Sequence, residues 1–227
     1  MPFKRYMVNV NKVEENKIVY LPQHSSKMKI KTEKNVNDEV NLIFAGNIGQ
    51  QQNVECILEA VAKVKTDKKY KIHIYGDGSS FEKCKNLAEN KQILDRVIFY
   101  GRVPKEQLYE VYSKMDAFLL TLCSEKDIGF VANTVPAKFQ GYISTGKPIL
   151  ATIDGGAREI IEKTKCGLVV AAGDINGFAE IIKEYVENPQ KYIEYGNRGK
   201  KYFDENYDKK VVIDKLEGYL RDLTDEK

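Results

Sequence analysis

Tryptophan is absent from this sequence of 227 residues, and histidine and cysteine are rare, with two and four copies. The cysteines lie far apart, without the short spacings of a zinc site or a disulfide framework (Cys56, Cys84, Cys123 and Cys166). We therefore expect reduced thiols, no metal site and a cytoplasmic protein. The histidines, His24 and His73, have no partners at the spacings that general-base catalysis requires.

Long apolar runs and an excess of one charge are also missing. No stretch approaches the ~20 apolar residues of a membrane-spanning helix, and residues 1–17 have no apolar core of the kind found in a secretory signal. The 36 basic and 33 acidic side chains leave a net charge of +3, which gives no reason to expect a nucleic-acid partner. Apolar residues make up 42% of the chain, enough for a sizeable core.

Six short apolar runs alternate with segments of helical periodicity from residue 40 onward. The runs are 40–46, 71–76, 96–101, 116–121, 148–152 and 167–171. Helices are expected at 53–65, 79–91, 104–114, 135–146, 157–163 and 175–186, the last one capped by Asp174. Apolar runs without polar alternation are typical of parallel strands that are covered on both faces. The pattern predicts an α/β fold with a doubly wound, Rossmann-like parallel sheet.

The chain divides into three parts on this pattern. Residues 1–38 form a polar approach segment or linker, 39–205 the α/β domain, and 206–227 a C-terminal helix. Within the first part, the run 17–22 is either an edge strand or a segment that packs on something else. Two helical segments after Pro189 are expected to meet near Asn206 and Tyr207.

Glycine-rich loops follow several of the expected strands, where ligands bind in such sheets. Gly46-Asn47-Ile48-Gly49 and Gly76-Asp77-Gly78 allow close approach of the backbone, and Gly155-Gly156 opens a helix with free amides. The alternative interpretation of the first two loops is a tight turn between strand and helix without a ligand. Asp77 could cap the next helix, and Arg102 is either a ligand contact or a solvated side chain. Gln52 is a candidate hydrogen-bond donor to a ligand.

Lys138 lies in the first turn of the helix expected at 135–146. Thr134 is expected to cap this helix, with Pro136 in its first turn, and Gly146 to end it. A cation near the N-terminus faces the positive end of the helix dipole, where an acid would be preferred. Either this small cost is tolerated, or an anionic ligand offsets it.

The loop 121–134 offers a purely structural account of the same lysine. Its length of about a dozen residues is typical of functional loops, and its Asp127 could pair with Lys138. Tyr142 lies one turn after Lys138 on the same helical face, where it either contacts a ligand or packs in the core. Glu159 is a candidate first-turn acid or hydroxyl acceptor.

Five motifs in order carry a resemblance to a known family. They are "FAGNIGQQQNVECILEA", "IYGDGSS", "VIFYGRVPKEQLYEVYSKMDAFLL", "TVPAKFQGYISTGKPILA" and "GLVVAAGD". Over residues 40–205, the chain resembles the C-terminal, donor-binding domain of a family 4 (group 1) glycosyltransferase with the GT-B fold, of the bacterial capsule and O-antigen type. The resemblance implies a nucleotide-sugar donor, usually a UDP-sugar, hexosyl or acetamidohexosyl transfer with retention, and no metal or other cofactor.

The resemblance also assigns roles to residues. Lys138 would be catalytic, and the donor would contact Gly46, Asn47, Gly49, Gln52, Gly76, Asp77, Arg102, Val103, Thr134, Val135, Pro136, Ala137, Tyr142, Gly155 and Gly156. Where the family has two glutamates in an E-x7-E motif, this chain has Phe130 and Lys138, and "VPAK" matches a "PxK" variant of the capsule-type branch. Glutamines replace the basic pair that often follows the first glycine loop.

A GT-B enzyme has two such domains, and only about 40 residues precede the first expected strand here. The resemblance therefore implies a single GT-B half, inactive without an N-terminal acceptor domain supplied in cis or in trans. The full enzyme could associate peripherally with the inner face of the membrane. The alternatives are a non-catalytic module that binds a nucleotide or a partner chain, and a nucleotide-sugar epimerase, for which no carboxylate pair is evident.

Overall fold

The computed structural model describes residues 2–25, 27–28, 39–124 and 134–225. Its centre is a six-stranded parallel sheet in the order β3-β2-β1-β4-β5-β6. The strands are β1 (Val40–Ala45), β2 (Tyr70–Tyr75), β3 (Val97–Gly101), β4 (Ala117–Thr121), β5 (Ile149–Thr152) and β6 (Gly167–Val170). Each coincides with one of the six apolar runs, so the predicted doubly wound α/β fold is confirmed.

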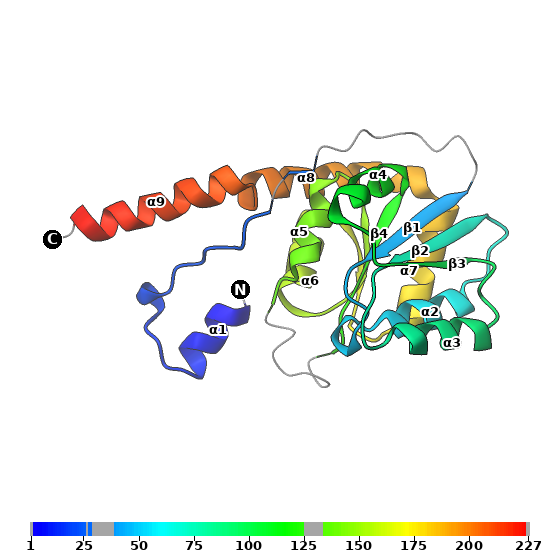
Figure 1. Cartoon of the computed structure of the whole chain (residues 1–227). Coiled ribbons are helices and arrows are strands. Elements are labelled where there is room, and N and C mark those ends of the chain that lie inside the picture. Colours follow the sequence, from blue (N-terminus) through cyan, green and yellow to red (C-terminus); the bar gives the residue numbers. More distant parts are fainter. Residues whose placement is uncertain (1, 26, 29–38, 125–133, 226–227) are drawn as a thin grey trace.

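Helices cover both faces of the sheet (Figure 1). One face packs against α2 (Val54–Lys63), α3 (Phe81–Asn90) and α7 (Ile175–Glu187). The other face packs against α4 (Lys105–Lys114), α5 (Ala137–Ser144), α6 (Gly155–Thr164) and α8 (Ile193–Asn206). Two apolar cores result, and most of their strand residues are fully buried.

The strand order reverses beside β1. The chain runs outward from β1 through β2 to β3, and then returns to place β4 on the other side of β1. The loops that leave β1 and β4 therefore run in opposite directions. This switch point opens a crevice at the carboxyl ends of the strands.

The ends of the chain lie outside the α/β layers. Helix α1 (Pro2–Asn9) and the following segment lie beside α6, and α9 (Lys209–Asp225) extends away from the domain (Figure 1). The amide of Ser25 donates a hydrogen bond to the carbonyl of Tyr207 at 3.0 Å, which ties the first segment to the junction of α8 and α9. No helix in the described ranges combines the length and the apolar character needed to cross a membrane.

Most expected helix signals agree with the structure. The Asp174 carboxylate accepts a hydrogen bond from the amide of Gly177 at 2.8 Å and caps α7. The break between α8 and α9 falls at Tyr207, as expected. Short 3₁₀ turns at 15–17, 50–52 and 189–192 were not anticipated.

Two expected helix caps were wrong. Helix α5 has Pro136 at its N-cap, not Thr134, and α3 has Ser80 there, not Asp77. Asp77 instead accepts a hydrogen bond from the next amide, that of Gly78, at 2.7 Å. The run 17–22 adds no edge strand to the sheet; after its first residue it is irregular and lies outside the layers. The expected linker at 31–38, Asp127 and Phe130 fall outside the described residues.

Lys147 is a buried cation that holds the C-terminal end of α4. Its ammonium donates hydrogen bonds to the carbonyls of Tyr112 and Ser113, each at 2.7 Å, and to that of Met115. Carbonyls at a helix end have no partner inside the helix. Burial lowers the pKa of Lys147 to about 8, although the nearby Asp116 carboxylate opposes the shift. Three acceptors satisfy its three donors, so this lysine needs no ligand.

Replacing Lys147 tests this cap. We expect Lys147→Met to lower the free energy of unfolding by about 3 kcal/mol, because each buried polar group that loses its partner costs about 1–3 kcal/mol. Urea denaturation measures the difference. Lys63→Met removes an exposed lysine from the end of α2 and is the control, with an expected change below about 1 kcal/mol. Equal losses in the two variants would contradict the role of Lys147.

Candidate functional site

Backbone hydrogen bonds join the loops that follow β1, β2 and β3. The Gly46 amide donates to the Tyr75 carbonyl at 2.9 Å, and the Gly76 amide donates to the Gly101 carbonyl at 2.8 Å, so the ladder continues past the strand ends. The Ile48 amide then donates to the Asp77 carbonyl at 2.9 Å. The two predicted glycine loops therefore lie side by side at the carboxyl ends of the strands.

Close backbone approach explains the glycines of the second loop. Gly76 has a φ of +135°, and a Cβ atom there would lie 1.8 Å from the carbonyl oxygen of Gly46. A Cβ atom on Gly78 would lie 2.5 Å from the carbonyl oxygen of Ile48. Packing between the loops thus demands glycine at 76 and 78, whether or not a ligand binds.

A pocket of about 530 Å³ opens beside these loops, and we call it the glycine-loop pocket. It is lined by the predicted residues Gly46, Asn47, Gly76, Asp77, Arg102 and Val103, together with Ala45, Tyr75, Gly78 and Leu108. Sequence reasoning missed Tyr75 and Leu108. Tyr75 is the last residue of β2, and its place at a strand end was the available signal. Its ring stacks on Tyr100 with centroids 4.2 Å apart.

Two other predicted residues, Gly49 and Gln52, lie near this pocket without lining it. Gly49 precedes the 3₁₀ turn Gln50–Gln52. The side-chain oxygen of Gln52 accepts a hydrogen bond from the Asn47 amide group at 3.0 Å, which orients Asn47. The carbonyl of Gln52 accepts a hydrogen bond from the Thr121 hydroxyl, which links the turn to β4.

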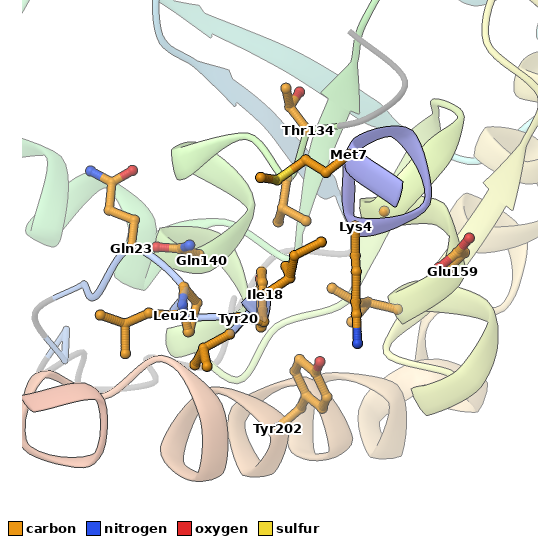
Figure 2. A pocket seen from close by; sticks show the side chains of 15 residues that line it. Lys4, Met7, Ile18, Tyr20, Leu21, Gln23, Thr134, Gln140, Glu159 and Tyr202 are labelled. Carbon is orange, nitrogen blue, oxygen red and sulfur yellow. The ribbon is translucent and has the colours of Figure 1, made fainter. Parts of the chain in front are cut away.

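The remaining predicted loop residues do not line the glycine-loop pocket. Thr134, Val135 and Gly156 line a second pocket of about 440 Å³, which also touches the N-terminal segment (Figure 2). Gly155 begins α6 with a φ of +72°. Glu159 is beyond the first turn of α6 and forms an ion pair with Arg5 at 2.6 Å. Pro136 is the N-cap of α5, followed by the exposed Ala137.

Lys138 lies behind Gly46, on the side of α5. Its ammonium nitrogen is buried and has no hydrogen-bond partner among the described residues. The nitrogen lies 4.2 Å from the centroid of the Phe44 ring, and 3.0 Å from where a Cβ atom of Gly46 would be. Burial lowers the pKa of Lys138 to about 8. At neutral pH the site therefore holds a cation that the described part of the chain does not neutralise.

Tyr142 places Lys138 by joining α5 to β1. It is fully buried, and its hydroxyl donates to the Ala45 carbonyl at 2.8 Å and accepts from the Ala45 amide at 2.9 Å. Its ring stacks on Phe118 with centroids 4.3 Å apart. Because Ala45 directly precedes Gly46, these hydrogen bonds hold helix α5, which carries Lys138, against the first glycine loop. Tyr142 does not line either pocket.

His73 lies in the interior of β2, away from this chemistry. Its ring nitrogens contact the Tyr100 hydroxyl at 2.9 Å and the Asn41 side-chain oxygen at 2.8 Å. Burial, helped by the charge of Lys71, lowers its pKa to about 4, so it is neutral at physiological pH. His73 therefore has a structural role in the sheet.

A family model described as glycosyl transferases group 1 matches residues 26–202. The lipopolysaccharide 1,6-galactosyltransferase of Escherichia coli (strain K12) is 32% identical over 139 residues, which cover 60% of this chain and 36% of that protein. The N-acetyl-alpha-D-glucosaminyl L-malate synthase of Bacillus anthracis is 25% identical over 182 residues, 80% of this chain and 45% of that protein. The chain spans less than half the length of these curated relatives.

Solved structures show the same fold. A sucrose-phosphate synthase from Thermosynechococcus elongatus matches with a TM-score of 0.83 at 16% identity, over 100% of this chain and 57% of that one. S. aureus TarM, crystallised with UDP, matches with a TM-score of 0.75 at 20% identity, over 95% of this chain and 41% of that one.

The tie between α5 and β1 can be tested with Tyr142→Phe. We expect the free energy of unfolding to fall by about 2–3 kcal/mol, because the buried amide and carbonyl of Ala45 lose their shared partner. Urea denaturation measures the change. Tyr112→Phe is the matched control, since Tyr112 is buried in the same cluster and its hydroxyl has no partner among the described residues. A loss as large in the control would show that ring packing, not the hydroxyl, carries the effect.

A second prediction concerns the stability of the ligand-free protein and follows from the unneutralised charge of Lys138. Lys138→Met should raise the free energy of unfolding by about 1–2 kcal/mol at pH 7, because a buried ammonium without a partner disfavours the folded state. The pKa of Lys138 in the folded protein, about 8, lies below the ordinary lysine value of 10.5. The unfolded chain therefore binds more protons between these two pH values, and wild-type stability rises with pH there.

The advantage of Lys138→Met should therefore shrink as pH rises from about 8 towards 10.5. Urea denaturation of both proteins at pH 7, 8.5 and 10 follows it, and Lys147 contributes equally to both. A variant less stable than wild type at pH 7 would contradict the assignment.

Proposed function

Because this chain belongs to the group 1 glycosyl transferases, we propose that its glycine-loop pocket binds the diphosphate of a nucleotide-sugar donor. Lys138 then assists the departure of that diphosphate during glycosyl transfer. The observation that carries this proposal is the buried ammonium beside Gly46, which has no hydrogen-bond partner in the described ranges. A bound diphosphate would supply the missing negative charge.

The chemistry follows from the charge that develops in transfer. Breaking the bond between the anomeric carbon and the phosphate oxygen leaves the electron pair on the diphosphate, whose negative charge grows. Lys138, near the N-terminus of α5, would stabilise that charge more in the transition state than in the ground state. The bound anion also offsets the unfavourable position of a cation at a helix N-terminus. In this proposal the lysine and backbone amides neutralise the leaving group, without a metal or another cofactor.

We further propose a UDP-sugar donor whose hexosyl or acetamidohexosyl group is transferred with retention. Arg102 and Val103, which line the same pocket as Gly46, would contact the nucleobase. TarM was crystallised with UDP. The relatives include the E. coli galactosyltransferase and a poly(ribitol-phosphate) alpha-N-acetylglucosaminyltransferase of Staphylococcus aureus. These names support a role in the synthesis of a bacterial surface polysaccharide such as a capsule.

The acceptor side is assigned to a separate domain, in cis or in trans. The chain spans less than half of the relatives named above, so on its own it should bind donor and transfer little or no sugar. The cytoplasm is the proposed compartment, at the inner face of the membrane for the full enzyme. All four cysteines are buried and outside any disulfide bond, which supports a reducing environment. The alternative is a non-catalytic nucleotide-binding module, which is favoured by Phe130 and Lys138 at the positions of the two glutamates in the family's E-x7-E motif.

Calorimetric titration with UDP tests the donor site. Lys138→Met should weaken UDP binding about 10- to 100-fold, because a charge-assisted hydrogen bond contributes about 1.5–3 kcal/mol. Lys201→Met, which removes an exposed lysine on the outer side of α8, should leave the affinity unchanged. Undiminished binding by Lys138→Met would remove Lys138 from the site. A thermal-shift series with UDP, GDP and dTDP identifies the base, since ligand at ~100 times Kd adds ~2.7 kcal/mol.

Transfer activity separates the two candidate functions. Full transfer activity of this chain alone would show that no separate acceptor domain is needed. UDP binding without sugar transfer, even when a matching acceptor domain is added, would favour the non-catalytic module.

A further inference from the structure

The second pocket has a different chemistry from the glycine-loop pocket. It lies between α5, α6 and α8 on one side and the N-terminal segment on the other, and it measures about 440 Å³, within the ~300–1,000 Å³ typical of small-molecule sites. Figure 2 shows Met7 and Ile18 on the side of the N-terminal segment and Tyr202 below them on α8. Residues 1–25 lie outside the matched family region, so one wall of the pocket is built by a segment that the family model does not cover.

Gln140 is a buried polar residue that lines this pocket. The residue is only 3% exposed, and it reaches the pocket from α5 (Figure 2). Its side-chain amide makes no hydrogen bond within the described ranges, and its polar atoms are not among the fully buried ones, so the amide is open to the pocket. An amide both donates and accepts, which matches a hydroxyl group of a ligand.

The charged residues of the pocket are already paired. Lys4 forms an ion pair with Glu15 at 3.0 Å, and Glu159 forms one with Arg5 at 2.6 Å. Neither charge is left to attract an ion. Much of the remaining lining is apolar, with Met7, Ile18, Leu21, Val135 and Ile160 around the space. A ligand that fits must therefore be uncharged, must offer a hydroxyl to Gln140, and must cover apolar side chains.

Helix geometry keeps this pocket apart from the phosphate site. Lys138 and Gln140 are two residues apart on α5, so their side chains leave the helix about 200° from each other. Lys138 contacts Gly46, while Gln140 and Val135 line the second pocket. Helix α5 thus contributes Gln140 to the second pocket and places Lys138 beside Gly46, although no residue of α5 lines the glycine-loop pocket itself.

We infer that the second pocket binds an uncharged, hydroxyl-bearing amphiphile, such as an alkyl glycoside, with a hydroxyl on the Gln140 amide and the apolar portion against Met7, Ile18 and Ile160. The site goes beyond the proposed donor function and does not rest on it, because no nucleotide takes part in binding. Its ligand is recognised by one neutral hydrogen-bonding group and apolar contact.

The test is a titration of the full chain with octyl β-D-glucopyranoside below its critical micelle concentration, followed by ¹H–¹⁵N NMR. Saturable shifts are expected at Val135, Gly156, Ile160 and the Gln140 side-chain amide. Gln140→Leu, which keeps the volume but removes the amide, should weaken binding about tenfold. Gln107→Leu changes an exposed glutamine of α4 in the same way and should leave the affinity unchanged.

Two comparisons make the outcome decisive. Octyl sulfate, with the same chain and an anionic head, should bind more weakly than the glucoside; equal binding would reduce the site to apolar association and overturn the inference. Shifts confined to α9, or full affinity in Gln140→Leu, would also overturn it. Gln140→Leu should still bind UDP, and Lys138→Met should still bind the glucoside, so a failure of the donor site and a failure of this site give different results.

Discussion

Two hydrogen bonds between the Tyr142 hydroxyl and the backbone of Ala45 hold helix α5 against the end of β1. The position of every candidate ligand group on α5 depends on this tie. It acts at the point where the strand order reverses, so the helix is fixed beside the crevice that the topology opens. The Ala45 amide and carbonyl are buried beside this tyrosine and cannot bond to water. The Tyr142 hydroxyl takes the place of water as their hydrogen-bond partner. A side chain in the core thereby sets the geometry of the surface loops.

Helix α5 then divides the chemistry of the molecule into two parts. The side with Lys138 faces the glycine loops, where backbone amides and a cation favour an anion. The side with Gln140 faces a pocket whose charges are already paired, where a neutral polar group and apolar contact remain. The separation follows from helical periodicity, since residues two apart point in nearly opposite directions. The same short segment can therefore serve two ligands of different charge without placing a cation in the apolar pocket.

The sequence predicted the layers of the fold well because apolar runs and helical spacing are local signals. All six strands, the Asp174 cap and the break at Tyr207 were accessible in this way. The sequence did not predict the division of the candidate site, since Gly46 and Gly156 both follow strands and only the packing of α5 separates them. Tyr142 was ambiguous for a similar reason: its hydroxyl partner, Ala45, is 97 residues away in the chain. The unfavourable position of Lys138 in the helix dipole was the local signal that drew attention to this residue, but its distance from the glycine loops could not be read from the sequence.

Lys138 and Lys147 show why burial alone does not mark a functional lysine. Burial lowers the pKa of both to about 8. The Lys147 ammonium donates its three hydrogens to carbonyls at the end of α4, so the fold itself satisfies this cation. Lys138 has only the face of Phe44, which covers the ammonium without accepting its hydrogens. Loss of the Lys138 proton would remove the cost of the buried charge only above about pH 8, and below that pH the lysine remains a cation. Within the described structure, no hydrogen-bond acceptor meets the Lys138 ammonium, and the neighbouring Gly46 has no side chain that could supply one.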